Sequence, residues 1–288
     1  MALGLLLTET AARLRSAGIV ASEREARWLL EEVAGLAASE LPSHLEQPAT
    51  QRQVARLDAL VARRSSGEPL QYVLGHWPFR SLDLLVDRRV LIPRPETEQL
   101  VDLVLVEVDR RRDAGPVSVV DLGTGSGAIA LAVASERVAA RVVASDRSSG
   151  ALAVARANLA GLGRPAARVL LVEGDWFDAL DPADRGSIHI VVSNPPYVAE
   201  TDEVDPAVRD WEPGSALYGG PGGTTDLERI VGAAADWLCV DGVLLVELDP
   251  RRAAWCRERA IAAGFAEVEV HQDLTGRDRF VVARRAPV

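Results

Sequence analysis

The hydrophobic positions in the first quarter of the chain repeat with a helical period. Three segments have apolar residues spaced by three to four, which predicts a helix in each: residues 3–16, 22–37 and 50–64. Gly18, Pro42 and Pro48 separate these segments, as residues that end helices do. Residues 1–75 are therefore predicted to form a small helical bundle. Because no catalytic pattern occurs in it, we assign this domain to substrate recognition.

The pattern changes after the bundle. From Trp77 to Leu91 apolar and polar residues alternate loosely, which predicts a β-hairpin linker over residues 76–92. From residue 93 to 288 apolar runs of strand length alternate with helical stretches, which is typical of a parallel sheet covered by helices. We therefore expect an α/β protein with a Rossmann-like, mostly parallel sheet, preceded by the helical bundle and the hairpin.

A glycine-rich loop follows the first strand of the predicted sheet, the apolar run 117–120. Its residues are Gly123, Thr124, Gly125, Ser126 and Gly127, and a helix of small residues comes next. Bare backbone at the carboxyl edge of a parallel sheet lets a ligand lie across such a loop. Taken alone, the pattern also fits a dinucleotide-binding loop, because matches of this kind are weak.

Two carboxylates add information about the ligand. Asp121 precedes the first glycine, where it would repel a pyrophosphate but can accept from an ammonium group through backbone or water. This favours S-adenosyl-L-methionine over NAD. Asp146 ends the second strand, residues 140–145, where a carboxylate can take both ribose hydroxyls. Asp146 suits either cofactor, so it indicates a nucleoside without choosing between them.

The third strand, residues 168–173, leads into two further candidates. Asp175 is placed to accept from an adenine amine, and Trp176 offers a flat apolar wall for the base. The alternative for Trp176 and the neighbouring Phe177 is ordinary core packing after a strand.

Asn194-Pro195-Pro196-Tyr197 follows the fourth strand, residues 188–193. The prolines stiffen the backbone and remove donors, which leaves the Asn194 side-chain oxygen and the Pro195 carbonyl as acceptors beside the Tyr197 ring. A flat NH2 group has two donors to satisfy and a face to stack, so an amide or an exocyclic amine is the expected target. The alternative is a turn that only terminates the strand.

In these motifs and their order, the chain resembles the protein-(glutamine-N5) methyltransferases that modify peptide chain release factors, the HemK/PrmC-type family. The blocks that carry the resemblance are residues 67–75, 91–98, 121–127, 174–177, 193–197 and 276–279. The departures are Ser149-Gly150, where the family usually has a proline, and Asp249, where it commonly has a glycine.

The resemblance implies a class I methyltransferase sheet of seven strands in residues 93–288. It implies that the glycine loop, Asp146, Trp176 and Asn194 contact S-adenosyl-L-methionine, which becomes S-adenosyl-L-homocysteine. It further implies that Asn194, Pro195, Pro196 and Tyr197 hold a glutamine in the Gly-Gly-Gln loop of class 1 release factors. On this basis Asn194, Pro195 and Tyr197 are the candidate catalytic residues.

Two further segments are candidates for contact with the substrate. Arg94, Thr97 and Glu98 follow or flank prolines at a helix start and are candidates for the substrate pocket entrance, with a helix cap as the alternative. Residues 198–223 form a long loop rich in Asp, Glu, Pro and Gly, for which a substrate lid or a docking surface is expected.

Composition limits the classes of partner and compartment. The net charge is −10 and the chain has no lysine, so direct nucleic-acid binding is not expected. The run Arg110-Arg111-Arg112 lies between aspartates and is interpreted as a solvated helix end. Cys239 and Cys256 have no metal-ligand spacing, so no metal site is predicted. The apolar patch at residues 3–7 has no basic flank, and a cytoplasmic protein without a membrane span is expected.

Three alternatives stay open. An amino-methyltransferase acting on adenine in DNA or RNA would meet the same two donors and flat face, although it would also need a basic channel. A glutamine on a ribosomal protein is a second possible substrate. A non-catalytic scaffold that binds S-adenosyl-L-methionine would leave the residues from Asn194 to Tyr197 without a role.

Overall fold

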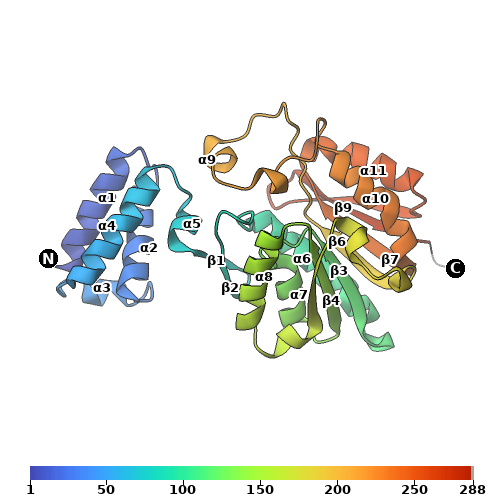
Figure 1. Cartoon of the computed structure of the whole chain (residues 1–288), viewed down its shortest axis with the longest axis horizontal. Coiled ribbons are helices and arrows are strands. Elements are labelled where there is room, and N and C mark those ends of the chain that lie inside the picture. Colours follow the sequence, from blue (N-terminus) through green and yellow to red (C-terminus); the bar gives the residue numbers. More distant parts are fainter. Residues whose placement is uncertain (287–288) are drawn as a thin grey trace. The chain divides into compact units, whose positions relative to one another are not determined.

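The computed structural model of the chain describes residues 1–286, so the last two residues of the predicted 93–288 domain lie outside the described part. The chain divides into two compact units (Figure 1). The first contains Met1–His76 together with the segment Asp205–Trp211, and the second contains Trp77–Val204 and the chain from Glu212 onward.

The first unit is a helical bundle, as predicted. Its helices are α1 (Leu3–Ser16), α2 (Ser22–Ala34), α3 (Leu41–His44), α4 (Gln51–Ser65) and α5 (Leu70–Leu74), joined by α9 (Pro206–Arg209) from the distant segment. The predicted helix 22–37 ends three residues early, because Gly35 adopts a left-handed conformation at its C-terminus. Thr50 and Gln53 form a capping box at the start of α4. Leu14, Leu29 and Leu30 are completely buried in the bundle core.

The predicted hairpin is present as a two-stranded sheet of β1 (His76–Phe79) and β2 (Leu82–Leu85). Arg80 occupies its turn with a positive φ of 54°. Its backbone N–H donates to Glu98 Oε1 at 2.9 Å, and its guanidinium pairs with Glu136. These contacts attach the hairpin turn to the rest of the second unit, which begins at Trp77.

The second unit contains the expected Rossmann-like sheet of seven strands. They are β3 (Val117–Leu122), β4 (Ala140–Asp146), β5 (Val169–Glu173), β6 (Ile188–Ser193), β7 (Leu238–Glu247), β8 (Glu267–Gln272) and β9 (Asp278–Arg284). Their order is β5-β4-β3-β6-β7-β9-β8. β9 runs antiparallel to both of its neighbours, β7 and β8, and the other neighbouring pairs are parallel. From the central strand β3, the chain adds β4 and β5 on one side. It then returns to add β6 and β7 on the other side. The carboxyl ends of β3 and β6 therefore flank the point where such sheets bind ligands.

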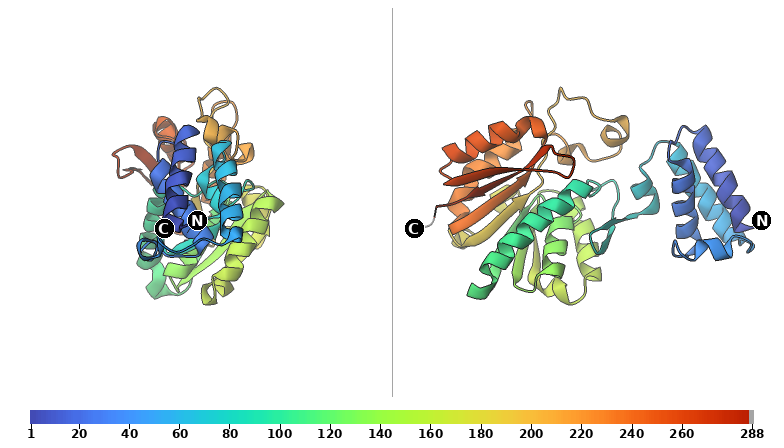
Figure 2. Two further views of the ribbon diagram at one scale, coloured as in Figure 1. Left: turned by 90° about the vertical axis from the view of Figure 1, so that its left-hand side faces the viewer. Right: turned by 180° about the vertical axis from the view of Figure 1, so that it is seen from behind.

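Helices cover both faces of this sheet (Figure 2). They are α6 (Pro95–Arg111), α7 (Ala128–Glu136), α8 (Ser149–Gly161), α10 (Thr225–Trp237) and α11 (Ala253–Ala262). Short 3₁₀ helices span Arg112–Ala114, Arg164–Arg168, Trp176–Ala179, Pro182–Asp184, Gly214–Ala216 and Pro250–Arg252. Val117 and Val119 of β3 join the core formed with α6 and α7, whereas Val120 and Leu122 join the core formed with α10 and α11. Both faces of the central strand are thus buried, as in other parallel sheets.

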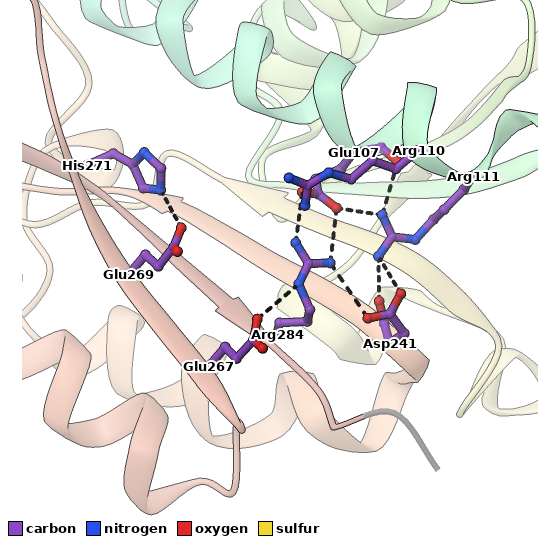
Figure 3. Close-up of polar contacts among 8 residues, drawn as sticks. All are labelled: Glu107, Arg110, Arg111, Asp241, Glu267, Glu269, His271 and Arg284. Atoms are coloured by element: carbon purple, nitrogen blue, oxygen red, sulfur yellow. Dashed lines mark hydrogen bonds and ion pairs between the residues drawn. The ribbon is translucent and has the colours of Figure 1, made fainter.

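An ion-pair network joins α6 to β7 and β9 (Figure 3). The Glu107 carboxylate accepts from Arg284 at 2.9 Å and from Arg111 at 2.5 Å, and Arg111 also pairs with Asp241. Burial acts against ionisation, but hydrogen bonds from the two arginines keep the pKa of Glu107 below its ordinary value. The interpretation of Arg111 as part of a solvated helix end is wrong, because its side chain is only 12% exposed.

Within residues 1–286, no helix has both the length and the apolar character needed to cross a bilayer. In the same part of the chain, no three His, Cys, Asp or Glu side chains are grouped as metal ligands would be.

Candidate functional site

A pocket lies at the carboxyl ends of β3, β4, β5 and β6. The predicted site residues that line it are Arg94, Thr97, Gly123, Thr124, Gly125, Ser126, Asp146, Asp175, Trp176, Asn194 and Pro196. Five predicted site residues do not line the pocket in the part of the chain that the structure describes: Glu98, Asp121, Gly127, Pro195 and Tyr197. The structure thus brings four strand ends together in one crevice, with five of the predicted residues outside its surface.

The glycine loop follows β3 and is packed tightly against Trp176. Gly123 has a φ of +73°, and a Cβ atom there would lie 3.1 Å from the indole ring. Any larger residue at Gly123 would therefore both strain the backbone and push the ring. Trp176 itself has a φ of 52°, and its Nε1 donates to Asp226 Oδ1 at 3.2 Å.

Asp121 lies beneath the loop rather than in the pocket. Its Oδ2 accepts from Thr124 Oγ1 at 2.6 Å and from the backbone N–H of Ala130 at 3.2 Å. Complete burial raises the pKa of Asp121 to about 7. The carboxyl therefore ties the glycine loop to the first turn of α7.

Asp146 faces the pocket from the end of β4. Its Oδ2 accepts from the backbone N–H of Gly125 and its Oδ1 from that of Ser148, both at 2.9 Å. Burial raises the pKa of Asp146, and these hydrogen bonds oppose the shift. The carboxylate is held firmly between the glycine loop and the start of α8, and each oxygen has a further lone pair for a ligand hydroxyl.

Asp175 and Trp176 form the wall that follows β5. Asp175 Oδ2 accepts from Arg229 at 2.7 Å, while its Oδ1 is buried and has no hydrogen-bond partner within residues 1–286. A buried acceptor without a partner is costly, and a ligand amine would satisfy it. Trp176 lines the pocket and is also part of the core, whereas Phe177 stacks on Trp237 at 5.7 Å, so core packing describes Phe177.

Asn194 enters the pocket from the end of β6. Its side-chain Nδ2 donates to Thr97 Oγ1 at 3.2 Å, and Thr97 Oγ1 donates to Glu247 Oε2 at 2.8 Å. Pro195 and Pro196 are buried. The side chain that carries the candidate acceptor is therefore anchored on its nitrogen side by residues of two other elements.

The backbone behind Asn194 is supported by the end of the long loop. Val198 N–H donates to Leu217 O and Gly219 N–H donates to Val198 O, both at 3.0 Å. A Cβ atom on Gly219 would lie 2.3 Å from Pro196 O, and one on Gly223 would lie 2.4 Å from Tyr197 O. Only glycine permits this close approach of the two backbones.

Tyr197 is partly buried against the core shared with α10 and α11. Burial, together with the nearby Glu247 carboxylate, raises the pKa of Tyr197 to about 12. Its hydroxyl therefore stays protonated at neutral pH and is not a general base.

The three residues near the start of α6 have separate surroundings. Thr97 contacts Asn194, as described, while Glu98 accepts from Arg80 in the hairpin turn. Arg94 lines the pocket and donates to Glu212 Oε1 at 2.5 Å. Glu212 is buried and also accepts from the backbone N–H of Ile92 at 3.1 Å. None of the three acts through a side-chain cap of α6, because the helix has none.

Several site residues were missed in the sequence. Glu212 and Glu247 are buried carboxylates at or beside the pocket, and each is more than 100 positions from its partner in the chain. The lining also includes Arg89, Val90, Leu91, Pro93, Ile129, Arg147, Ser148, Ala151, Gly174, Pro213, Ser215 and Ala216. A carboxylate at the end of a buried apolar run was the available signal for Glu247, since such a charge needs a partner.

Comparisons with known proteins agree with this arrangement. Residues 6–75 match the family model described as PrmC N-terminal domain, and residues 102–211 match the one described as Methyltransferase small domain. A methyltransferase from Pyrococcus furiosus has a similar fold, with a TM-score of 0.52 and 18% identity over 82% of this chain and 100% of that one.

Two curated relatives match nearly the whole chain. The release factor glutamine methyltransferase of Bifidobacterium longum is 39% identical over 96% of this chain and 98% of its own. The protein of the same name from Deinococcus radiodurans is 41% identical, with 98% of both chains covered. The resemblance carried by the sequence motifs is thus confirmed, and the chain belongs to the family of release factor glutamine methyltransferases.

Proposed function

We propose that this protein transfers a methyl group from S-adenosyl-L-methionine to the side-chain amide nitrogen, N5, of a glutamine in class 1 peptide chain release factors, within their Gly-Gly-Gln loop. The observation that carries the proposal is the Asn194 carboxamide, anchored through its nitrogen at the edge of the pocket. The names of the relatives support the substrate, and the pocket residues support the methyl donor.

The pocket residues fit such a donor. In this assignment the carboxylate of Asp146 binds the ribose hydroxyls and the free Oδ1 of Asp175 accepts from the adenine amine. The Trp176 ring covers one face of the base, and the glycine loop passes beneath the remaining part. Asp121 acts from behind the loop by holding its shape.

When bound, S-adenosyl-L-methionine supplies a methyl group that its sulfonium charge has already activated. The protein must then chiefly position a poor nucleophile, because the lone pair of an amide nitrogen is delocalised. Alignment can contribute up to about 7–11 kcal/mol. We assign this task to Asn194 Oδ1 and the Pro195 carbonyl, which accept the two amide hydrogens and favour the charge that develops on nitrogen. Tyr197 does not line the pocket but directly follows Pro196, which does, and it is proposed to stack on the amide. No strong base is needed because the methylated nitrogen can release its proton to water.

Asp146→Ala is expected to weaken binding of S-adenosyl-L-methionine by at least about tenfold, because a hydrogen bond to a charged group contributes roughly 1.5–3 kcal/mol. The loop would also lose the contact at Gly125. Calorimetric titration of the donor measures the effect. The turnover number at saturating donor should change much less, and an unchanged dissociation constant would contradict the assigned role.

The acidic composition argues against the adenine-methyltransferase alternative, since phosphate neutralisation provides most of the affinity for nucleic acid. The deciding experiment incubates the purified protein with labelled methyl donor and release factors, their Gln-to-Ala versions, ribosomal proteins, or nucleic acid. Label should appear only on release factors that retain the glutamine. Label on nucleic acid alone would support the alternative.

The helical unit and the segment Asp205–Trp211 that groups with it are proposed to recognise the release factor. Exposed acidic residues, among them Glu200 and Glu203, lie in the part of the loop that precedes this segment. Because proteases preferentially cut exposed loops, limited proteolysis should cleave within residues 198–211. A bound release factor should slow this cleavage. Equal cleavage with and without the factor would exclude a lid or docking role. The cytoplasmic location remains a prediction.

A further inference from the structure

Three polar side chains from different elements form a continuous chain that begins with two residues of the pocket wall, Asn194 and Thr97, and ends at the buried Glu247. Asn194 follows β6, Thr97 lies in the first turn of α6, and Glu247 ends β7. Asn194 Nδ2 lies 3.2 Å from Thr97 Oγ1, which lies 2.8 Å from Glu247 Oε2. Thr97 is 4% exposed and Glu247 is 1% exposed, so water does not compete for these hydrogen bonds.

The chemistry of this chain determines which end of the Asn194 carboxamide faces the pocket. An ionised carboxylate can only accept, so the single hydroxyl hydrogen of Thr97 is directed to Glu247. Thr97 Oγ1 can then only accept from Asn194, which requires the NH2 end of the carboxamide. The oxygen, Oδ1, is left on the opposite side of the carboxamide.

We propose that Thr97 and Glu247 are positioning residues that hold Asn194 with Oδ1 available to the hydrogens of a substrate amide. This inference rests on the proposed function. Without the two residues, the carboxamide could rotate by half a turn and present NH2 to the NH2 of the substrate. Two donors facing each other would repel the substrate nitrogen at the point where it must be aligned.

The surroundings of Glu247 make this arrangement dependent on pH. The charged groups near it are Arg279 of β9 and Arg94 and Glu96 at the start of α6, and Tyr197 lies close by. Burial, opposed mainly by the Thr97 hydrogen bond, raises the pKa of Glu247 to about 7. Above this value the carboxylate accepts from Thr97. Below it, the protonated carboxyl can donate to Thr97 Oγ1. The hydroxyl hydrogen of Thr97 is then free to be donated to Asn194 Oδ1, which favours the rotated carboxamide.

The test compares Thr97→Val and Thr97→Ser with the unaltered protein, using a release factor as substrate. Thr97→Val keeps the side-chain volume but removes the hydroxyl, so kcat/KM should fall by about tenfold to hundredfold, as for other small misplacements of reacting groups. Thr97→Ser should recover most of the loss. Donor affinity, measured by calorimetry, should stay within about twofold. Thr10→Val, which alters a buried threonine in α1, is the control in thermal unfolding for the effect on stability of losing a buried hydroxyl.

Glu247→Gln provides a second, independent measurement. Its amide does not titrate, so the rise of kcat/KM with pH through about 7 should be present in the unaltered protein and absent from this variant. Activity of Thr97→Val within twofold of the unaltered protein, or an identical pH profile for Glu247→Gln, would overturn the inference. The proposed function fails separately, if the unaltered protein places no methyl group on the release-factor glutamine.

Discussion

Asn194→Ala should lower kcat for glutamine methylation by roughly 10²–10³-fold, the loss that follows removal of one polar group that stabilises developing charge. The physical reason is that alanine has no acceptor for the amide hydrogens, so the substrate nitrogen is neither aligned nor stabilised as charge develops on it. Single-turnover methylation of a release factor measures the change.

The same variant should bind S-adenosyl-L-methionine nearly as well as the unaltered protein. Asp146, Asp175, Trp176 and the glycine loop, which we assign to the donor, remain in place. Calorimetric donor titration and thermal unfolding therefore serve as controls for folding. Near-normal turnover of Asn194→Ala would show that the acceptor role is assigned to the wrong group.

Gly223→Ala is expected to lower activity through a change in the backbone alone. Gly223 has a φ of +67°, and an added Cβ would lie 2.4 Å from Tyr197 O and 2.9 Å from Ala199 N. The left-handed conformation costs an alanine about 1–2 kcal/mol, and relief of the overlap must displace the backbone that follows Asn194. We expect at least about tenfold lower kcat, since a shift near 1 Å can cost 10²-fold. Methylation assays and chemical denaturation measure the two effects.

Gly222→Ala is the matched control, one residue earlier in the same loop. A Cβ there would meet only Thr224 Oγ1, at 3.5 Å, among the described residues within 4 Å. It should retain nearly full activity and stability. Equal effects of the two substitutions would indicate that the loop is sensitive to any added side chain. The contact with Tyr197 would then not be the cause.

Much of the fold was predictable because its determinants are local. The helical period of residues 3–16 matches α1, and the apolar run 188–193 matches β6. Parallel strands place their carboxyl ends on one edge, so the meeting of Gly125, Asp146 and Asn194 also followed from the order of strands and motifs. The limits of α2 were less accurate, because the turn at Gly35 ended the helix before the apolar pattern ended.

The roles of other residues depended on contacts that are remote in the chain. Arg111 looked like a solvated charge, but its side chain is largely buried and pairs with Glu107 and Asp241. Glu98 was grouped with Thr97, yet α6 turns the two side chains to different partners, Arg80 and Asn194. Adjacent helical residues point in different directions, and sequence spacing alone does not say what each direction meets.

The sequence by itself determined the class of fold, the family and the strand ends at which the pocket forms, because periodicity, turn residues and motif order are recorded within short stretches. Only the tertiary structure decided which end of the Asn194 carboxamide is anchored. Thr97 is 97 positions from Asn194 in the chain, and Glu247 is 150 positions from Thr97. Each buried group fixes whether its neighbour donates or accepts, and these groups are far apart in the sequence. No local sequence pattern therefore encodes the orientation of the carboxamide.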